Sequence, residues 1–359
     1  MIRIFMVGMS SDKGGVESYI KNLCEHLDSK EFEVIYSWPV MEIEGKKWIQ
    51  PSNRHNYIKY ANFWHCFFKE NRFDVIYYNT CDIVSVDLLK FAKKARVPVR
   101  IIHSHSTANQ FKLRLFHRIT EWYNRKNIHN IATTLLACSQ EAGKWMFGEK
   151  KYVVIRNGID LKKYLYNQQE RNSCRESLNV KNKYLIGCVG RLDPEKNPLM
   201  SVQIMNRINE LYGNAKFIFI GDGELRKKVE QSIKEKEMQD MVVMLGAINS
   251  VARWYSALDC LIMPSLFEGI PFTLVEAQTA GLPCVVSDTV SRNANITGLV
   301  QYIGLEENID IWANKILEGC QNKRKDRTQQ LVNAGYSISD TAERVSEIIK
   351  STLKGLDVK

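Results

Sequence analysis

The hydrophobic pattern of the chain alternates short apolar runs with amphipathic or charged segments. A first series of runs consists of IRIFMVG, FEVIYSW, FDVIYYN, VRIIHSH and TLLACS, and a helical pattern, GGVESYIKNLCEHL, follows the first run. A second series consists of YLIGCVG, KFIFIG, VVMLG, CLIMPS and PCVVSD. Strands that alternate with helices predict parallel sheets covered on both faces. Two such series predict two doubly wound α/β domains.

The length of 359 residues also favours two domains. Asn157-Gly158, in VIRNGIDLKKY, is a turn signal after the first series, and a polar stretch leads from there to the strand at Tyr184. We therefore expect an N-terminal domain over residues 1–165 and a C-terminal domain over residues 166–338. Residues 339–359 carry apolar positions at helical spacing and predict a C-terminal helix.

Export and membrane signals are not apparent in the sequence. The N-terminus has the pattern of a first strand rather than of a signal peptide, and no run approaches the ~18 apolar residues of a spanning helix. The nine cysteines are scattered, mostly in apolar surroundings, and lack the spacing of a zinc site or a thioredoxin-like motif. We expect a cytoplasmic protein with reduced thiols.

The net charge of +10 is concentrated in one stretch. Residues 88–126 hold ten basic residues and one acid, and part of this stretch, FKLRLFHRITEWYNR, interleaves large apolar side chains with Arg and Lys. This pattern is typical of an interfacial helix on anionic lipid, and equally of a solvated basic face on a packed helix. Nucleic acid is a third option, but no known nucleic-acid-binding module is present.

The loops that follow the strands are the expected place for ligands in open α/β sheets. Gly14 and Gly15 precede a helix whose first N–H groups would favour an anion or a hydroxyl group. In GRLDPEKNP, Arg191 and Lys196 lie on a loop that Pro194 keeps non-helical, so both cations can point at one diphosphate. The alternative is that Asp193 and Glu195 neutralise them.

Two further loops carry polar residues of less specific pattern. Asp222 and Glu224, in GDGEL, resemble a metal-binding pair, but their place at a helix start favours a structural role over a metal. His103 and His105, in IIHSHSTAN, point to the same face of a strand without a third metal ligand nearby.

The stretch SLFEGIPFTLVEAQTAG places two acids eight residues apart. Pro271 favours the start of a helix after Glu268, and Gly281 favours its end, so Glu268 should lie in a loop and Glu276 inside the helix. The first N–H groups of that helix are expected to be free for an anion. We expect the two acids to accept hydrogen bonds from hydroxyl groups on either side of bound phosphates, as in a nucleotide sugar. The rival interpretation is the acid and nucleophile pair of a glycosidase.

These motifs together resemble family-4 glycosyltransferases of the GT-B architecture. The resemblance implies an enzyme that retains the anomeric configuration of the sugar and needs no metal ion. FEGIPFTLVEA resembles the E-x7-E signature, and GGVESY, RNGID, GRLDPEKNP, GDGEL and PSLFEG precede it in the order of the family. The resemblance spans most of the chain. It implies two Rossmann-like domains around a cleft, with a C-terminal helix that can cross back to the N-terminal domain.

The resemblance also implies roles for individual residues. Arg191 and Lys196 would stabilise the diphosphate, Glu276 would hold the ribose, and Glu268 would hold the transferred sugar. His105 matches the histidine beside the reacting sugar, with His103 as the alternative. The implied catalytic residues are His105, Arg191, Lys196 and Glu268, and the implied donor-binding residues are Gly15, Arg191, Lys196, Gly246, Ala247, Ile248, Glu268, Gly269, Phe272, Thr273, Leu274 and Glu276.

The implied activity is transfer of a hexosyl group from a nucleotide sugar, with a UDP-sugar expected from its frequency in the family. The acceptor would be a lipid-linked oligosaccharide or another glycan of bacterial capsular, exopolysaccharide or lipopolysaccharide synthesis, met at the inner face of the membrane. We expect no cofactor, no metal and no nucleic acid. The alternatives are a nucleotide-sugar epimerase or hydrolase of the same architecture, a protein-glycosylating transferase, and a silent binding protein.

Overall fold

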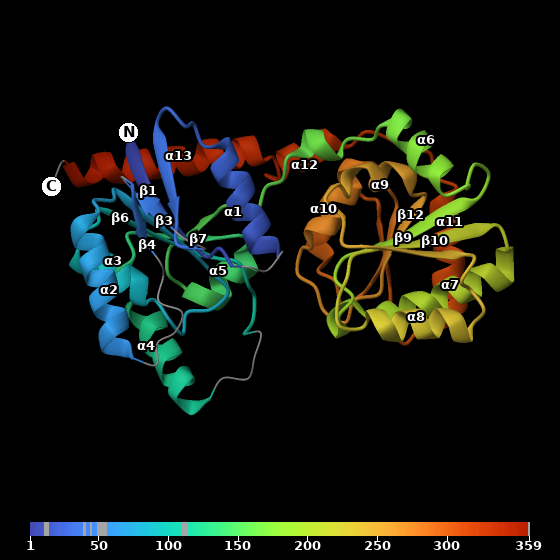
Figure 1. Cartoon of the computed structure of the whole chain (residues 1–359), viewed down its shortest axis with the longest axis horizontal. Helices are drawn as coiled ribbons and strands as arrows, with labels where there is room; N and C mark the ends of the chain where they lie inside the picture. The colour runs from blue at the N-terminus through green and yellow to red at the C-terminus, as the bar shows by residue number, and fades with distance from the viewer. Residues whose placement is uncertain (11–13, 39–40, 44, 49–55, 110–113, 358–359) are drawn as a thin grey trace. The chain divides into compact units, whose positions relative to one another are not determined.

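The computed structural model describes residues 1–10, 14–38, 41–43, 45–48, 56–109 and 114–357. The chain divides into two compact units, one formed by Met1–Ile159 with Gly335–Lys359 and the other by Asp160–Ala334. Each unit contains a parallel six-stranded sheet with helices on both faces (Figure 1). The predicted architecture of two doubly wound α/β domains is therefore confirmed.

The sheet of the N-terminal unit has the strand order β2-β1-β5-β6-β7-β8. The chain leaves β1 toward β2 on one side and returns to β5 on the other, so the order reverses between β1 and β5. The strands are β1 (Ile2–Val7), β2 (Phe32–Tyr36), β5 (Val75–Thr80), β6 (Val99–Ser104), β7 (Thr134–Ala137) and β8 (Val153–Val154), with a separate hairpin of β3 (Met41–Ile43) and β4 (Lys46–Trp48). The helices are α1 (Gly15–His26), α2 (Tyr57–Glu70), α3 (Asp87–Lys94), α4 (Leu115–Ile131), α5 (Gln140–Phe147) and α13 (Ile338–Asp357).

The sheet of the second unit has the order β11-β10-β9-β12-β13-β14, which reverses between β9 and β12. Its apolar strands are buried on both faces, as the continuous hydrophobic runs predict. The strands are β9 (Tyr184–Val189), β10 (Ala215–Ile220), β11 (Val242–Gly246), β12 (Cys260–Met263), β13 (Cys284–Ser287) and β14 (Val300–Ile303). The helices are η1 (Leu161–Tyr164), α6 (Gln168–Ser177), η2 (Pro194–Lys196), α7 (Pro198–Tyr212), α8 (Arg226–Glu235), α9 (Ala252–Ala257), α10 (Phe272–Thr279), η3 (Arg292–Ala294), α11 (Ile309–Cys320) and α12 (Thr328–Asn333).

The C-terminal helix α13 belongs to the N-terminal unit, as the GT-B resemblance implies. Ile159 and Ser337 form a parallel bridge just before the helix begins, and α13 then packs against α1. Its apolar positions Ala342, Val345 and Ile349 are buried. The periodic pattern in the last residues of the sequence thus marks the face of the helix that packs.

All nine cysteines lie in the described residues and are free thiols. Within the described ranges, no helix combines the length and the apolar character that crossing a bilayer requires. The basic stretch of residues 88–126 covers most of α3, all of β6 and most of α4, and residues 110–113 of it lie outside the described residues.

Candidate active site

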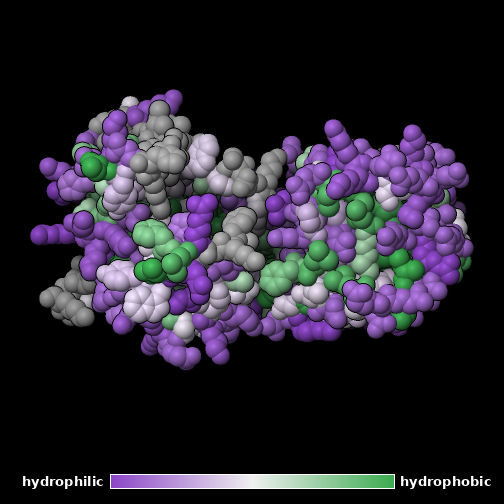
Figure 2. All heavy atoms as spheres, turned by 90° about the horizontal axis from the view of Figure 1, so that it is seen from below, coloured by the Kyte–Doolittle hydropathy of each residue, from purple (hydrophilic) through white to green (hydrophobic). Residues whose placement is uncertain are grey.

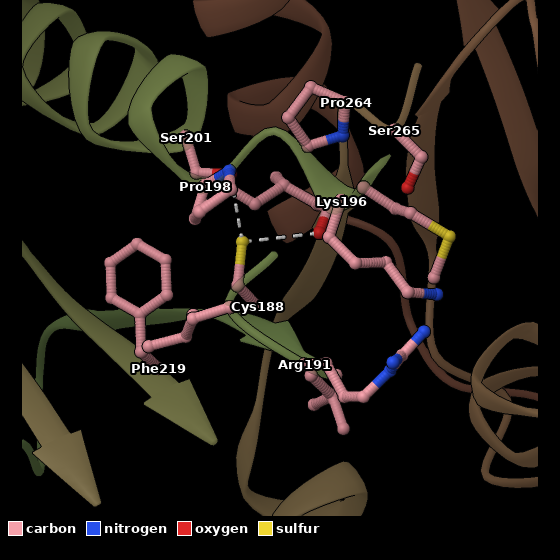
Figure 3. Close-up of a pocket in the computed structure, with 13 residues that line it drawn as sticks. Cys188, Arg191, Lys196, Pro198, Ser201, Phe219, Pro264 and Ser265 are labelled. Carbon is pink, nitrogen blue, oxygen red and sulfur yellow. Dashed lines mark hydrogen bonds between the residues drawn. The ribbon is translucent and has the colours of Figure 1, made fainter. Parts of the chain in front are cut away.

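A small pocket lies at the carboxyl ends of β9 and β12, where the strand order of the second unit reverses. Arg191 and Lys196 line it together with Cys188 and Ser265 (Figure 3). Figure 3 shows the cationic ends of Arg191 and Lys196 extending toward the same side of this pocket. Cys188 is not a candidate nucleophile, because burial raises the pKa of its thiol to about 12.

The loop that carries the two cations has a fixed backbone conformation. The Asp193 carboxylate accepts the N–H of Lys196 (3.1 Å) and so caps the short helix η2, which begins at Pro194. Asn197 follows in the left-handed conformation (φ 50°) and turns the chain into α7. This local sequence therefore sets the direction in which Lys196 leaves the backbone.

Both cations form an ion pair with an acid. Arg191 pairs with Asp193 (3.1 Å), and 69% of its side chain stays exposed. Lys196 Nζ donates to the carboxylate of Glu268. The alternative that Asp193 and Glu195 neutralise the two cations is thus half right. Asp193 pairs with Arg191, but the partner of Lys196 is Glu268 and not its neighbour Glu195. The structure brings together two of the predicted site residues that lie 72 positions apart.

Gly221 of the GDG loop packs closely against the backbone of the cationic loop. A Cβ atom on Gly221, whose φ is +143°, would lie 1.9 Å from the carbonyl oxygen of Gly190. Leu192 donates its N–H to Asp222 O (3.0 Å), and Gly221 donates to Gly246 O (2.8 Å). Only glycine allows this close backbone approach. The loops after β9, β10 and β11 therefore form one hydrogen-bonded layer.

The acid of the GDG loop has a structural partner. The Asp222 carboxylate pairs with Arg226 (3.0 Å), and hydrogen bonds from the N–H of Gly223 and from Arg226 lower its pKa. The described part of the chain contains no group of three or more His, Cys, Asp or Glu side chains that could hold a metal ion.

The loop that carries Glu268 is anchored at both ends. Ser265 O accepts from the hydroxyl groups of Ser287 (2.5 Å) and Thr289 (2.6 Å) in the loop after β13. Glu268 O accepts the N–H of Ser291 (3.1 Å), and Leu266 N donates to Glu195 O (2.7 Å). These bonds hold the Glu268 backbone next to the η2 turn, where its side chain meets Lys196.

The helix α10 begins at Phe272, so Glu268 lies in the loop and Glu276 in the helix, as predicted. No side chain caps its N-terminus. The prediction of free N–H groups is wrong for Leu274, because its N–H donates to Pro271 O (3.0 Å) and tightens the first turn. Among the described residues, the N–H groups of Phe272 and Thr273 have no such partner. Both N–H groups lie in the first turn and point toward the start of the helix. A Cβ atom on Gly269 would meet nothing within 4 Å, so the space before α10 is open.

Glu276 occupies a separate, buried environment. Tyr255 of α9 donates its hydroxyl to the Glu276 carboxylate (2.6 Å). Burial raises the pKa of Glu276, while hydrogen bonds from Tyr255 and Tyr164 act in the opposite direction. The two tyrosines therefore favour the carboxylate form, which burial disfavours. Sequence reasoning missed both tyrosines, because single aromatic residues in η1 and α9 carry no spacing that marks them.

The predicted base-contacting segment follows β11. Gly246 ends the strand with φ +70° and accepts the N–H of Gly221, which joins it to the GDG loop. Ala247 is exposed, and Ile248 packs on the core of the unit. In the N-terminal unit, Gly15 is the first residue of α1, and its neighbour Gly14 caps the helix without a side-chain bond.

The two histidines of the N-terminal unit differ in their partners. His103 is fully buried, its Nε2 faces Ile155 O (3.1 Å) and its Nδ1 faces the Tyr77 hydroxyl (3.0 Å). A carbonyl only accepts, so His103 Nε2 carries the proton and Nδ1 accepts from Tyr77. Both ring nitrogens of His103 are therefore used by the fold.

His105, whose ring lies 4.1 Å from that of His103, keeps one nitrogen unused. Its Nε2 contacts Asn79 Oδ1 (2.9 Å), and Asn79 Nδ2 donates to Val7 O (2.9 Å), which fixes the amide orientation. Nε2 of His105 thus carries the proton, and Nδ1 is buried without a hydrogen-bond partner in the described residues. Burial lowers the pKa of His105 to about 3, so the ring is neutral, and the nearby Asn157 side chain opposes this shift.

Known proteins match both halves of the chain. Residues 13–163 match Glycosyltransferase Family 4, and residues 170–337 match Glycosyl transferases group 1. EpsF of Bacillus subtilis (strain 168), designated a glycosyltransferase, is 27% identical over 356 residues, which cover 93% of this chain and 92% of that protein. The UDP-Gal:alpha-D-GlcNAc-diphosphoundecaprenol alpha-1,3-galactosyltransferase of Escherichia coli is 26% identical over 303 residues, which cover 73% of this chain and 78% of that enzyme. The crystal structure of Anabaena HepE in complex with UDP superposes with a TM-score of 0.74 at 18% identity, covering 98% of this chain and 100% of HepE.

The fold of two doubly wound units, the loop layer at the strand switch point and these matches define a glycosyltransferase with the GT-B architecture. The two family matches lie one in each half of the chain and, with these relatives, support a family-4 glycosyltransferase.

Proposed function

We propose that the chain transfers a hexosyl group from a UDP-sugar to a lipid-linked glycan in bacterial polysaccharide synthesis. The bond between the anomeric carbon and the diphosphate oxygen breaks, the acceptor oxygen bonds to that carbon, and the acceptor proton passes to the leaving diphosphate. Departure and attack occur on the same face of the sugar, so the anomeric configuration is retained.

The arrangement of Arg191, Lys196 and Glu268 at the strand switch point carries this proposal. The ammonium group of Lys196 has three donors, so it can keep Glu268 and still donate to a phosphate oxygen. Arg191 is exposed and, within the described ranges, pairs only with Asp193, which leaves further guanidinium donors for a second oxygen. Two cations placed there can stabilise the charge that develops on the diphosphate without a metal ion.

The remaining donor contacts follow from the elements around this pair. The N–H groups of Phe272 and Thr273 would bind phosphate at the positive end of α10. Glu268, held beside Lys196, would accept hydrogen bonds from the transferred sugar, and Glu276 from the ribose. The segment of Gly246, Ala247 and Ile248 would contact the base through its backbone. Gly15 would approach the donor at the start of α1, and Gly269 and Leu274 would complete the contacts at α10.

His105 is the proposed residue of the N-terminal unit beside the reacting sugar. Its Nδ1 is buried and has no hydrogen-bond partner in the described residues, so a sugar hydroxyl would have to enter beside the Asn157 side chain to bond it, whereas both nitrogens of His103 are already bonded. A neutral ring suits this role, because the transition state carries positive charge on the sugar and an imidazolium would oppose it.

The acceptor and the donor draw support from the relatives. The name of the Escherichia coli relative gives UDP-Gal as donor and a diphosphoundecaprenol-linked sugar as acceptor. We propose the same classes here, with the enzyme working at the cytoplasmic face of the membrane.

The experiment is a donor panel. The chain is incubated with UDP-, GDP- and ADP-linked hexoses in the presence and absence of an undecaprenyl-diphosphate-linked glycan, with and without EDTA. Released nucleoside diphosphate and the new glycoside are quantified, and the anomer is assigned by NMR. We expect release from a UDP-sugar that depends on the acceptor, an unchanged anomer, and full activity in EDTA.

Each alternative has a distinct result. Donor loss without a new glycoside would replace the proposal with a hydrolase, and an altered sugar on intact donor would replace it with an epimerase. An inverted anomer would overturn retention, and loss of activity in EDTA would overturn metal independence.

A further inference from the structure

The helix α4 of the N-terminal unit is amphipathic on the face that the fold leaves uncovered. Its packed residues are Asn124, Ile128 and Ile131. Five of its exposed residues are large and apolar, with exposed fractions of 74% for Leu115, 71% for Phe116, 55% for Ile119, 61% for Trp122 and 54% for Tyr123. We call these five residues the α4 stripe.

The spacing of the α4 stripe is that of one helix face. At about 100° per residue the five side chains fall within a sector of about 120°. The packed residues Asn124, Ile128 and Ile131 fall on the opposite side of the helix. Figure 2, which views the chain from the side on which α4 lies, shows a green patch there beside purple residues. Contiguous exposed apolar surface of this kind marks an interaction site in a soluble fold.

Basic side chains accompany the stripe. Arg114 and Arg118 lie along one border of it, are exposed, and have no ion pair among the described residues. Lys126 extends the stripe by one turn, with its ammonium group 5.3 Å from the ring of Trp122. Arg125 is different, because Glu121 neutralises it (2.8 Å) and its guanidinium lies over Trp145. The cations left without an acid are therefore those next to the apolar residues.

We propose that the α4 stripe and its arginines dock the enzyme on an anionic lipid bilayer. Trp and Tyr prefer the headgroup region, Leu, Phe and Ile enter the acyl boundary, and Arg and Lys bind lipid phosphates. The combination of five exposed apolar residues and unpaired cations fits a surface that is apolar below and negative above. This inference goes beyond the proposed reaction and does not require it.

Other occupants of the stripe fit less well. A second copy of the chain would bring its own arginines against Arg114 and Arg118, and like charges oppose such a contact. Nucleic acid would satisfy the cations but offers little apolar surface to Leu115, Phe116 and Ile119.

The test is co-sedimentation of the full chain with vesicles in the absence of donor and acceptor. Vesicles of phosphatidylcholine alone are compared with vesicles that also contain phosphatidylglycerol, at low and at high salt. The stripe variant is Phe116→Ser with Trp122→Ser, and Leu211→Ser on α7, another exposed apolar position, is its control. The cation variant is Arg114→Gln with Arg118→Gln, and Lys227→Gln with Lys228→Gln on α8 changes the net charge equally.

We expect binding of the unchanged chain to the phosphatidylglycerol vesicles that weakens with salt. The stripe variant should bind at least about tenfold more weakly, and the cation variant about 30-fold more weakly at low salt, while both controls stay within about twofold. Equal binding to both kinds of vesicle, or an equal loss in the Lys227 and Lys228 control, would overturn the proposal. So would a dimer in light scattering that the stripe variant abolishes while vesicle binding is absent. Since no donor is present, these outcomes are independent of the transferase reaction.

Discussion

The tyrosine contact to Glu276 gives the most direct link between local geometry and a measurable energy. Tyr255→Phe removes the hydroxyl that donates to the buried carboxylate over 2.6 Å and changes little else, because the ring keeps its shape. Hydrogen bonds to charged groups contribute about 1.5–3 kcal/mol, against about 0.5–1.5 kcal/mol for neutral ones. We therefore expect Tyr255→Phe to lower the free energy of unfolding at pH 7 by about 1.5–3 kcal/mol.

This loss should depend on pH in a defined direction. The pKa of Glu276 is raised by burial, so the folded chain keeps a proton that the unfolded chain releases above about pH 4.3. The stability contribution of this group is full below that pH and falls as the pH rises through the folded pKa. The tyrosines limit the fall by stabilising the anion. Without Tyr255 the pKa rises further, so the variant should lose more stability at pH 7 than at pH 4.

Urea unfolding of the variant and of the unchanged chain at pH 4 and pH 7 measures both quantities. The matched control is Tyr302→Phe, which removes a hydroxyl that donates to a neutral acceptor, Ser291 O (3.0 Å). The control should lose about 0.5–1.5 kcal/mol at both pH values. An equal loss at pH 4 and pH 7 for Tyr255→Phe would refute the argument that its partner is a buried anion.

Two other predictions concern the loop layer and the histidines. Gly221→Ala should destabilise the chain by about 2–5 kcal/mol, because of the positive φ of Gly221 and its contact with Gly190 O. The control Gly269→Ala should leave the thermal stability unchanged. Equal melting temperatures for the two variants would contradict the close backbone packing between the loops after β9 and β10. His103→Ala should cost about 2–4 kcal/mol of stability. The pH profile of kcat/KM of the unchanged enzyme should show no histidine step between pH 5 and 8, because burial lowers the pKa of His105 to about 3. A step near pH 6.5 would instead show an imidazolium at the site.

Most of the fold follows from the hydrophobic pattern. Every apolar run that the sequence marks as a strand is a strand, and Pro271 and Gly281 place the ends of α10 correctly. The short edge strands β8 and β14 and the β3–β4 hairpin escaped prediction. They are two to four residues long. Unlike the equally short β7, β12 and β13, β14 and the hairpin do not stand in a continuous apolar run, and β8 is only two residues long, so no pattern marks them.

The candidate site could be predicted only as far as its contacts are local. The split between a loop acid and a helix acid depends on one proline and was therefore readable. The ion pair between Lys196 and Glu268 was not, because it depends on the adjacency of β9 and β12 in the sheet. The same holds for Tyr164 and Tyr255, which reach Glu276 from η1 and α9 through tertiary packing alone.

Lys196 and Arg191 are proposed to form the diphosphate site of a nucleotide-sugar transferase. The direct measurement is kcat/KM with a UDP-sugar and its acceptor for Lys196→Gln and Arg191→Gln, with Lys227→Gln as a control for charge. We expect a loss of about 10²–10³-fold for Lys196→Gln, a smaller loss for the more exposed Arg191→Gln, and no change in the control. A Lys196→Gln enzyme within about threefold of the unchanged enzyme would contradict the account.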